Sequence, residues 1–293
     1  HDRGMACTGI EPTARSAAIS RGLGLTVIEE FLTAGLANRL VGLGPKAELL
    51  VANNVLAHVP DINDFAAACS IILADDGVAT FEFPHVLQLV ALTQFDTIYH
   101  EHFSYLSLAA VEAVFSSVGL VVFDIERLTT HGGSLRVFAQ HEGTGGFSSA
   151  QRVGAVRSLE AEVGVASAEY YSGFQDRADL IRNEFLAFLL TARDEGRSVA
   201  AYGAAAKGNT LLNYAGVDSG LISFVADRNS AKQDQYLPGS RIPIVGEEHI
   251  MRLRPDHVVI FPWNLREEIA GQLDYIRDWS GTFVTAVPEL QVW

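Results

Sequence analysis

The strongest constraint on this fold is an alternation of short apolar runs with segments of helical periodicity. Residues 47–53 form a largely apolar run, and residues 78–83 and 199–202 form similar ones. Strands that are covered by helices on both faces of a parallel sheet have this composition. Asp61 precedes one of the helical segments and has the side chain of an N-cap. The sequence therefore predicts an α/β fold built on parallel sheets.

Two such alternations are separated by residues 150–195, in which apolar residues recur three and four positions apart, as in Phe185 and Leu189. At roughly 150 residues per domain, a chain of 293 residues fits two domains. We predict a first α/β domain over residues 1–145, a helical connector over 146–196, and a second α/β domain over 197–293.

The charge of the chain excludes some classes of partner. It has 35 acidic residues against 21 Lys and Arg, for a net charge of −14, which argues against nucleic-acid binding. No apolar run approaches the ~20 residues of a membrane helix. Cys7 and Cys69 cannot form a disulfide framework, so we expect a reducing cytoplasm. The sequence leaves the oligomeric state open.

Polar residues follow two apolar runs of the first domain. Glu11 stands where doubly wound folds place an acid against a ribose diol, although it could instead cap the next helix. Asn53, Asn54 and His58 follow the run 47–53, where amides could bind a small cofactor. An Asn-rich turn that satisfies its own backbone is the alternative.

The segment 95–103 has the densest chemistry in the chain. Tyr99, Glu101 and His102 supply an oxyanion donor, an orienting carboxylate and a base of near-neutral pKa, as an enolate mechanism requires. His100 and His102 could together bind a metal, but in an extended stretch they would face opposite sides. A purely structural aromatic turn is the third interpretation.

A predicted antiparallel strand pair, residues 120–125 and 135–140, closes the first sheet. The connection between them contains Gly132 and Gly133. His131 precedes these glycines and could reach the same site, although a histidine in a hairpin is usually a surface residue.

The loop 202–210 of the second domain joins a strand to a helix with small residues. Its helix amides and Lys207 suit a diphosphate, although it matches neither the Walker loop nor the dinucleotide fingerprint. Asp227 ends the next strand and Trp263 follows a later one, where it could stack on a base. Close-packing glycines and a buried Trp are the structural alternative. The candidate substrate-binding residues here are Gly203, Lys207, Asn209, Asp227, Trp263 and Asn264.

Five runs in this order, residues 53–60, 81–84, 95–103, 131–133 and 202–209, resemble S-adenosylmethionine-dependent C-methyltransferases of nucleotide-linked 4-keto-deoxysugars. The resemblance implies a Rossmann-like class I methyltransferase domain, and a second Rossmann-like domain that holds the nucleotide diphosphate. It also implies an N-terminal zinc module and a Gly-rich cofactor loop, neither of which is in this sequence. We therefore expect an N-terminally truncated chain that lacks the first strand of the domain, binds no metal itself and binds the cofactor weakly.

The resemblance also implies a mechanism and a set of roles. A base removes the proton beside the sugar ketone, and the enolate attacks the sulfonium methyl group. By this resemblance His102 is the base, with Tyr99 and Glu101 beside it and His58 near the developing oxyanion. From the patterns described above, we expect Glu11, Asn53 and Asn54 at the cofactor, and His131 with the six residues above at the substrate.

Two other functions remain open. An NAD(P)-dependent oxidoreductase of nucleotide sugars could use Asp227 and the Gly203 loop, but a standard fingerprint is absent. A non-catalytic module that binds nucleotide sugars is the other possibility.

Overall fold

The computed structural model describes residues 4–144 and 146–293, which fall into two compact units. The first comprises the described residues of His1–Phe83, Phe103–Leu128 and Leu135–Glu160, and the second comprises Pro84–His102, Thr129–Ser134 and Ala161–Trp293. Residues 84–102 and 129–134 therefore group with the C-terminal part of the chain. The boundary that we placed at residue 145 lies outside the described residues, and the three-part division stays a prediction.

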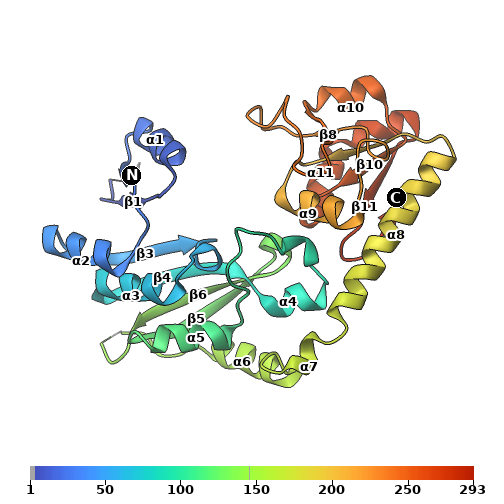
Figure 1. The fold of residues 1–293 in the computed structure, drawn as a ribbon. Coiled ribbons are helices and arrows are strands. Elements are labelled where there is room, and N and C mark those ends of the chain that lie inside the picture. The colour runs from blue at the N-terminus through green and yellow to red at the C-terminus, as the bar shows by residue number, and fades with distance from the viewer. Residues whose placement is uncertain (1–3, 145) are drawn as a thin grey trace. The chain divides into compact units, whose positions relative to one another are not determined.

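The first unit contains a four-stranded sheet in the order β3-β4-β6-β5 (Figure 1). β3 and β4 are parallel, with Asn53 opposite Glu82. The predicted strand 47–53 is confirmed, and the predicted strand 78–83 is the second half of β4. The strands are β3 (Ala47–Asn53), β4 (Leu73–Pro84), β5 (Leu120–Leu128) and β6 (Ser134–His141).

Three helices in the described part of this unit begin at side-chain caps, which are Thr33, Asp61 and Ser107. The Asp61 carboxylate accepts hydrogen bonds from the backbone N–H groups of Asn63 and Asp64, at 3.1 and 3.0 Å, which confirms the predicted N-cap. Phe81 of β4 packs against Phe115 with ring centroids 4.7 Å apart, in the core that the helices cover. The helices are α2 (Ala34–Leu43), α3 (Ile62–Ile72), α5 (Leu108–Ser116) and α6 (Gln151–Val163).

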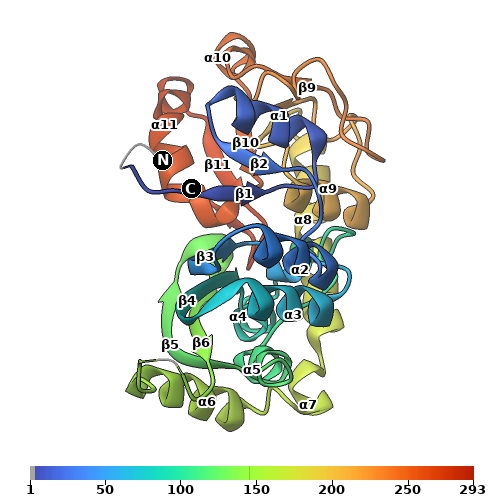
Figure 2. The same cartoon turned by 90° about the vertical axis from the view of Figure 1, so that its left-hand side faces the viewer.

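The first residues of the chain form a sheet of their own. β1 (Thr8–Ile10) and β2 (Thr26–Ile28) pair in parallel, and α1 (Ala14–Gly22) connects them (Figure 2). Thr8 lies opposite Thr26. This β-α-β arrangement agrees with the predicted alternation, and it places Glu11 directly after β1.

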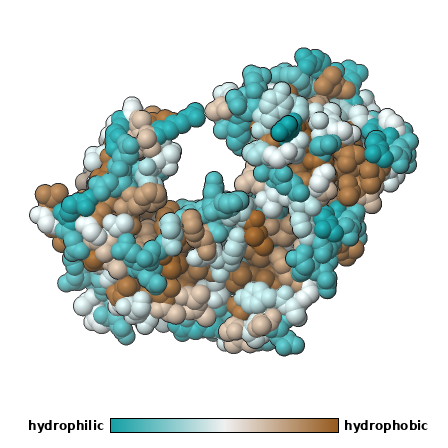
Figure 3. Space-filling model, viewed as in Figure 1, coloured by the Kyte–Doolittle hydropathy of each residue, from teal (hydrophilic) through white to brown (hydrophobic). Residues whose placement is uncertain are grey.

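One expectation about β3 is wrong. Its composition predicts burial on both faces, but Leu50 and Ala52 are buried while Leu49 and Val51 are 61% and 59% exposed. β3 is an edge strand of its sheet, and the described residues cover only one of its faces. Figure 3 shows hydrophobic residues among the hydrophilic ones on the surface facing the viewer.

The second unit contains a six-stranded sheet in the order β12-β11-β10-β7-β8-β9, parallel except for β12. After the central β7 the chain passes to β8 on one side and later to β10 on the other. The carboxyl ends of β7 and β10 therefore meet at a topological switch point, where such sheets bind ligands. The strands are β7 (Val199–Tyr202), β8 (Val225–Ala226), β9 (Ile244–Val245), β10 (His257–Ile260), β11 (Thr282–Thr285) and β12 (Gln291–Val292).

The prediction that residues 150–195 are largely helical is confirmed. The long helix α8 buries Ile181, Phe185 and Leu189 in the core of the second unit. Among the described helices, none has both the length and the apolar composition to cross a membrane. The helices of this unit are α4 (Val86–Ala91), α7 (Ala168–Tyr171), α8 (Phe174–Asp194), α9 (Ala206–Ala215), α10 (Glu248–Leu253) and α11 (Arg266–Gln272).

A buried carboxylate joins α6 to the start of α5. Glu160 is 4% exposed, and its two oxygens accept hydrogen bonds from the backbone N–H groups of Leu108 at 2.6 Å and Ala109 at 3.1 Å. A carboxylate at a helix N-terminus satisfies donors that have no acceptor within the helix.

We expect Glu160→Ala to lower the free energy of unfolding of this unit by about 2–4 kcal/mol, because the buried N–H group of Leu108 and the N–H group of Ala109 lose a charged acceptor. Far-UV circular dichroism in a urea titration measures the change. Glu162→Ala, at an exposed position of the same helix, is the matched control and should change the midpoint little. Equal midpoints for both variants would contradict the role of Glu160.

Candidate functional site

The segment 84–102 is held to the rest of the second unit by side-chain hydrogen bonds. The Arg177 guanidinium donates to Thr93 Oγ1 at 3.1 Å and to the Val90 carbonyl at 3.2 Å. The Gln94 amide donates to the Gly132 carbonyl at 2.8 Å. The part of the chain that contains the candidate base is thus fixed in position by residues distant in sequence.

His102 lies at the end of a turn in this segment. Its backbone N–H donates to the Tyr99 carbonyl at 3.0 Å, and the two rings lie with centroids 4.4 Å apart. The ring nitrogen Nδ1 is 2.8 Å from the Thr97 carbonyl oxygen. Because a carbonyl can only accept, Nδ1 carries the hydrogen, and Nε2 is the basic nitrogen of the neutral ring.

The turn corrects one argument from the sequence. We expected an extended segment with His100 and His102 on opposite sides, but residues 99–101 form a turn. His100 and Glu101 are exposed and His102 is half-buried. Among the described residues, no group of three His, Cys, Asp or Glu side chains could hold a metal ion.

The candidate residues of the first unit lie at the ends of its strands. His58 belongs to a short 3₁₀ helix, Leu56–His58. The backbone N–H groups of Phe103 and Ser104 donate to the Ala57 carbonyl at 2.9 and 3.3 Å. The residues that follow His102 in the chain are therefore bonded to the residue before His58.

The proposed cofactor residues lie at or just after the ends of β1 and β3. The Glu11 backbone and carboxylate are both in use, since Oε1 accepts from the Thr13 N–H at 2.7 Å. Asn53 is exposed at the end of β3, and Asn54, with a left-handed φ of 54°, donates its N–H to the Glu82 carbonyl at 2.8 Å. Carboxylate and amide groups at strand ends fit the polar parts of S-adenosylmethionine.

In the second unit, two glycines allow the ends of β7 and β10 to approach closely. Gly203 has a φ of +90°, and a Cβ atom there would lie 2.6 Å from the Pro262 ring. A Cβ atom on Gly208, in the first turn of α9, would lie 2.4 Å from the Phe261 ring. A side chain at Gly203 would push the end of β7 away from Pro262, and one at Gly208 would push α9 away from Phe261.

Lys207 lies on the first turn of α9. Its ammonium donates to Asn264 Oδ1 at 3.2 Å and lies 4.5 Å from the centroid of the Trp263 ring. Burial lowers the pKa of Lys207, and the charge of Asp96 opposes this. The N-cap residue Ala205 has no side-chain acceptor, so the first amides of α9 are not capped by its side chain.

Asp96 is the buried acid beside Lys207. It is 2% exposed, and its Oδ2 accepts a 2.8 Å hydrogen bond from Trp263 Nε1. Among the described residues Oδ1 has no hydrogen-bond partner. Burial raises the pKa of Asp96, whereas Lys207 and the bond from Trp263 lower it.

Asp227 holds the Gly203 loop. Its Oδ2 accepts from the Ala204 N–H at 2.8 Å and lies 3.4 Å from Lys232 Nζ, while Oδ1 accepts from the Asn229 N–H at 2.8 Å. In the same region the buried Oδ1 of Asn209 has no partner among the described residues.

His131 is exposed in a short 3₁₀ helix, Thr130–Gly132. The second unit thus brings together the ends of β7, β8 and β10 and the segments 94–102 and 130–132.

Comparison with known proteins decides the family. Residues 129–288 match the family described as the C-methyltransferase C-terminal domain. The C-methyltransferase NovU of Streptomyces niveus is 32% identical over 289 residues, which cover 99% of this chain and 69% of that protein. The chain belongs to the C-methyltransferase family. The prediction of a C-methyltransferase is confirmed.

Solved methyltransferases resemble parts of this C-methyltransferase. Magnesium protoporphyrin IX methyltransferase of Synechocystis PCC 6803, with bound S-adenosylhomocysteine, is 14% identical, with 48% of this chain and 66% of that chain covered and a TM-score of 0.38. An S-adenosylmethionine-dependent methyltransferase of Mesorhizobium loti is 12% identical, with 48% and 83% covered and the same TM-score.

Four residues that build the site of this C-methyltransferase are not among those predicted from its sequence. Asp96 could have been found, since an acid between Phe95 and Thr97 in an aromatic segment indicates a buried carboxylate that needs a partner. No local pattern indicates the roles of the other three, which depend on partners distant in sequence. These are Gln94, Arg177 and Lys232.

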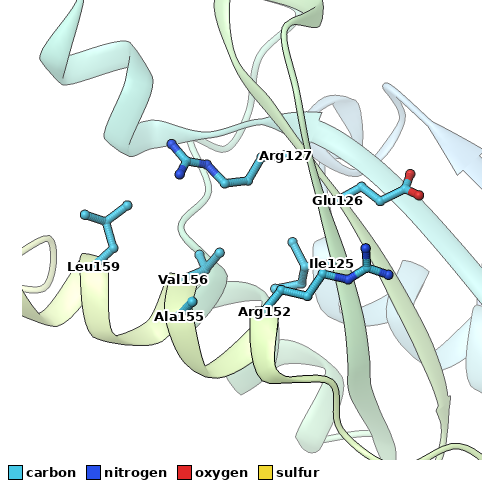
Figure 4. Close-up of a pocket in the computed structure, with 7 residues that line it drawn as sticks. All are labelled: Ile125, Glu126, Arg127, Arg152, Ala155, Val156 and Leu159. Atoms are coloured by element: carbon cyan, nitrogen blue, oxygen red, sulfur yellow. The ribbon is translucent and has the colours of Figure 1, made fainter.

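A cavity of about 350 Å³ lies elsewhere, between β5 and α6 of the first unit (Figure 4). α6 lines it with Ala155, Val156 and Leu159, and β5 contributes Arg127. None of the candidate catalytic or binding residues lines this cavity.

We expect Gly208→Ala to destabilise the second unit by about 1–3 kcal/mol, because the new methyl group overlaps the Phe261 ring. Gly271→Ala, in α11 with no atom within 4 Å of an added Cβ, is the control and should be neutral or slightly stabilising. Trp fluorescence reports unfolding of this unit selectively, because all three Trp residues lie in it. A loss of stability in the Gly271 variant alone would contradict this assignment.

Proposed function

We propose that this protein methylates the carbon beside the ketone of a nucleotide-linked keto-deoxysugar, through an enolate. The observation that carries the proposal is the orientation of His102. Its Nδ1–H is directed to the Thr97 carbonyl and its ring lies against Tyr99, so Nε2 is the nitrogen that can take a proton.

The residues of the second unit perform the first step. His102 Nε2 takes the proton, and the electrons of the C–H bond move into the enolate. The ring of Tyr99 lies against that of His102, and we assign the Tyr99 hydroxyl group to stabilise the developing oxyanion. Glu101 directly precedes His102 in the chain, and we assign its carboxylate to orient the reacting groups.

S-adenosylmethionine is the methyl donor, and it supplies an electrophilic methyl group to the enolate carbon. Glu11 binds its ribose hydroxyl groups, and the amides of Asn53 and Asn54 bind its polar groups. Glu11 and the two amides stand at the carboxyl ends of parallel strands, where doubly wound folds bind nucleotides.

The nucleotide diphosphate binds at the switch point between β7 and β10, and the unit acts as a Rossmann-like domain. Lys207 and the first amides of α9 bind phosphate oxygens, and Gly203 allows close approach of the backbone. Trp263 and Asn264 fix the Lys207 ammonium. Asp227, Asn209 and His131 bind the sugar and the ribose.

Transfer of labelled methyl from S-adenosylmethionine to a keto-sugar nucleotide tests the proposed reaction. The experiment uses the protein with each of several 4-keto-6-deoxysugar nucleotides, and mass spectrometry locates the methyl group. Label at the carbon beside the ketone supports the proposal. Oxidation of the sugar with a nicotinamide cofactor, or binding of the sugar nucleotide without turnover, would overturn it.

Lys207→Ala should weaken diphosphate binding by about 1.5–3 kcal/mol, because a charge-assisted hydrogen bond to phosphate is lost. Calorimetry with uridine and thymidine diphosphates measures the difference. The pH dependence has a defined sign. Only the ammonium form of Lys207 binds phosphate. Because burial lowers the pKa of Lys207 below its ordinary 10.5, the affinity of the wild type for the diphosphate falls as the pH rises through this lowered pKa.

The control for this experiment is Lys46→Ala, at a lysine of the first unit that pairs with Asp75. It should leave diphosphate affinity and its pH dependence unchanged. An Lys207 variant that binds as tightly as the wild type would place the diphosphate elsewhere.

His102→Ala should lower solvent-deuterium exchange at the carbon beside the ketone by about 10²–10⁴-fold, because loss of a positioned base has effects of this size. Nuclear magnetic resonance of the sugar measures the exchange, with sugar-nucleotide binding retained. His100→Ala, at the exposed histidine of the same turn, should exchange at nearly the wild-type rate. Loss of exchange in the His100 variant instead would assign the base to the wrong histidine.

A further inference from the structure

Three side chains of the second unit, Asp96, Lys207 and Trp263, form one connected group, which we call the Asp96 cluster. Trp263 donates its indole N–H to Asp96 Oδ2 at 2.8 Å, and the ring of the same residue lies 4.5 Å from the Lys207 ammonium. A single indole therefore contacts both charges. Neither the family assignment nor the proposed reaction gives Asp96 a role.

The two charges of the Asp96 cluster depend on each other. Asp96 is 2% exposed, and Lys207 is largely buried. In such surroundings each charge is stabilised mainly by the other, by the indole, and by the Asn264 oxygen that accepts from Lys207. The Oδ1 atom of Asp96 lacks a hydrogen-bond partner among the described residues. The stability of the Asp96 charge therefore depends more strongly on Trp263 and Lys207.

One peptide unit and one hydrogen bond connect Asp96 to the candidate base. Asp96 is the middle residue of the 3₁₀ helix Phe95–Thr97. The backbone and hydroxyl groups of Thr97 both donate to the Gln94 carbonyl, at 3.1 and 2.8 Å, which fixes the orientation of this helix. The carbonyl of Thr97, the next residue, accepts the hydrogen bond from His102 Nδ1.

The same helix packs against α9, the helix that carries Lys207. Phe95 contacts Tyr214 of α9 with ring centroids 5.3 Å apart. The first turn of α9 is thus connected to the Thr97 carbonyl in two ways. The 3₁₀ helix Phe95–Thr97 packs against α9, and the charge of Asp96 interacts with that of Lys207.

We propose that Asp96 is a positioning residue that couples anion binding at Lys207 to the orientation of the His102 ring. This inference rests on the proposed function, because it takes the diphosphate as the anion and His102 as the base. An anion at Lys207 competes with Asp96 for the ammonium. The Asp96 charge is then stabilised mainly by the Trp263 indole and by the backbone of its own 3₁₀ helix. The resulting shift of this helix moves the Thr97 carbonyl, and this changes the tautomer of His102. By linkage, the tautomer of His102 affects anion affinity by the same factor.

The test uses the full chain with labelled histidine and tryptophan nitrogens. Spectra that correlate ring nitrogens with ring protons give the tautomer of His102, and the indole N–H signal of Trp263 reports the Asp96 cluster. Uridine diphosphate is the probe, and pyrophosphate is the probe without a base. In the wild type, we expect the Nδ1–H tautomer in the free protein and a response of both signals to saturating probe.

In Asp96→Asn, which keeps the shape and removes the charge, the Trp263 signal should still respond to the probe. The His102 ring should no longer respond, and about five- to tenfold more of the other tautomer should be present in the free protein, a typical size for coupling between sites. Trp263→Phe removes the N–H donor and keeps the ring, and it should lose the His102 response in the same way. Asp278→Asn, at an exposed position of the same unit, should behave as the wild type.

The outcomes separate this inference from the proposed function. If neither probe binds, the diphosphate site and the coupling are both overturned. If a probe binds and shifts the Trp263 signal but not the His102 signal of the wild type, the coupling alone is overturned. The same conclusion follows if Asp96→Asn, folded by circular dichroism, retains the full response of His102.

Discussion

The hydrogen bond between the Trp263 indole and the Asp96 carboxylate is the interaction on which the arrangement of the second unit depends. It joins a residue after β10 to a residue 167 positions earlier in the chain. The segment 84–102 contains polar backbone and side-chain groups, and a charged carboxylate within it would be costly to bury alone. The indole and the Lys207 ammonium together lower that cost, so the segment can pack against α9 and present Tyr99 and His102 in a fixed turn.

The parallel sheet supplies the other half of this arrangement. Because the chain leaves β7 in one direction and returns through β10 on the other side, both strand ends face the same edge. Gly203 lets the end of β7 approach Pro262, and Gly208 lets α9 approach Phe261, to distances that no side chain would permit. Asp227 then fixes the loop that leads from β7 to α9, through the Ala204 N–H group. This geometry brings Lys207 and Trp263 together at the switch point.

Local patterns in the sequence predicted the elements that carry this geometry. The strands 47–53 and 199–202 have the predicted bounds, and Asp61 caps its helix, because apolar runs and capping residues act over a few positions. The turn at Tyr99 could not be predicted from the alternation of side chains, since it depends on contacts of the preceding helix. The exposure of Leu49 and Val51 could not be predicted either, because it depends on which face of β3 other elements cover.

The environment of His102 also bears on the kind of base that it can be. In many enzymes a carboxylate accepts the Nδ1–H of the catalytic histidine and stabilises the imidazolium ion that forms. Here a neutral carbonyl, that of Thr97, takes this position, and Glu101 is exposed. A carbonyl orients the ring but stabilises the imidazolium less than a full negative charge does. Such a base suits a proton that is already acidic, which is what the reaction proposed above requires of it.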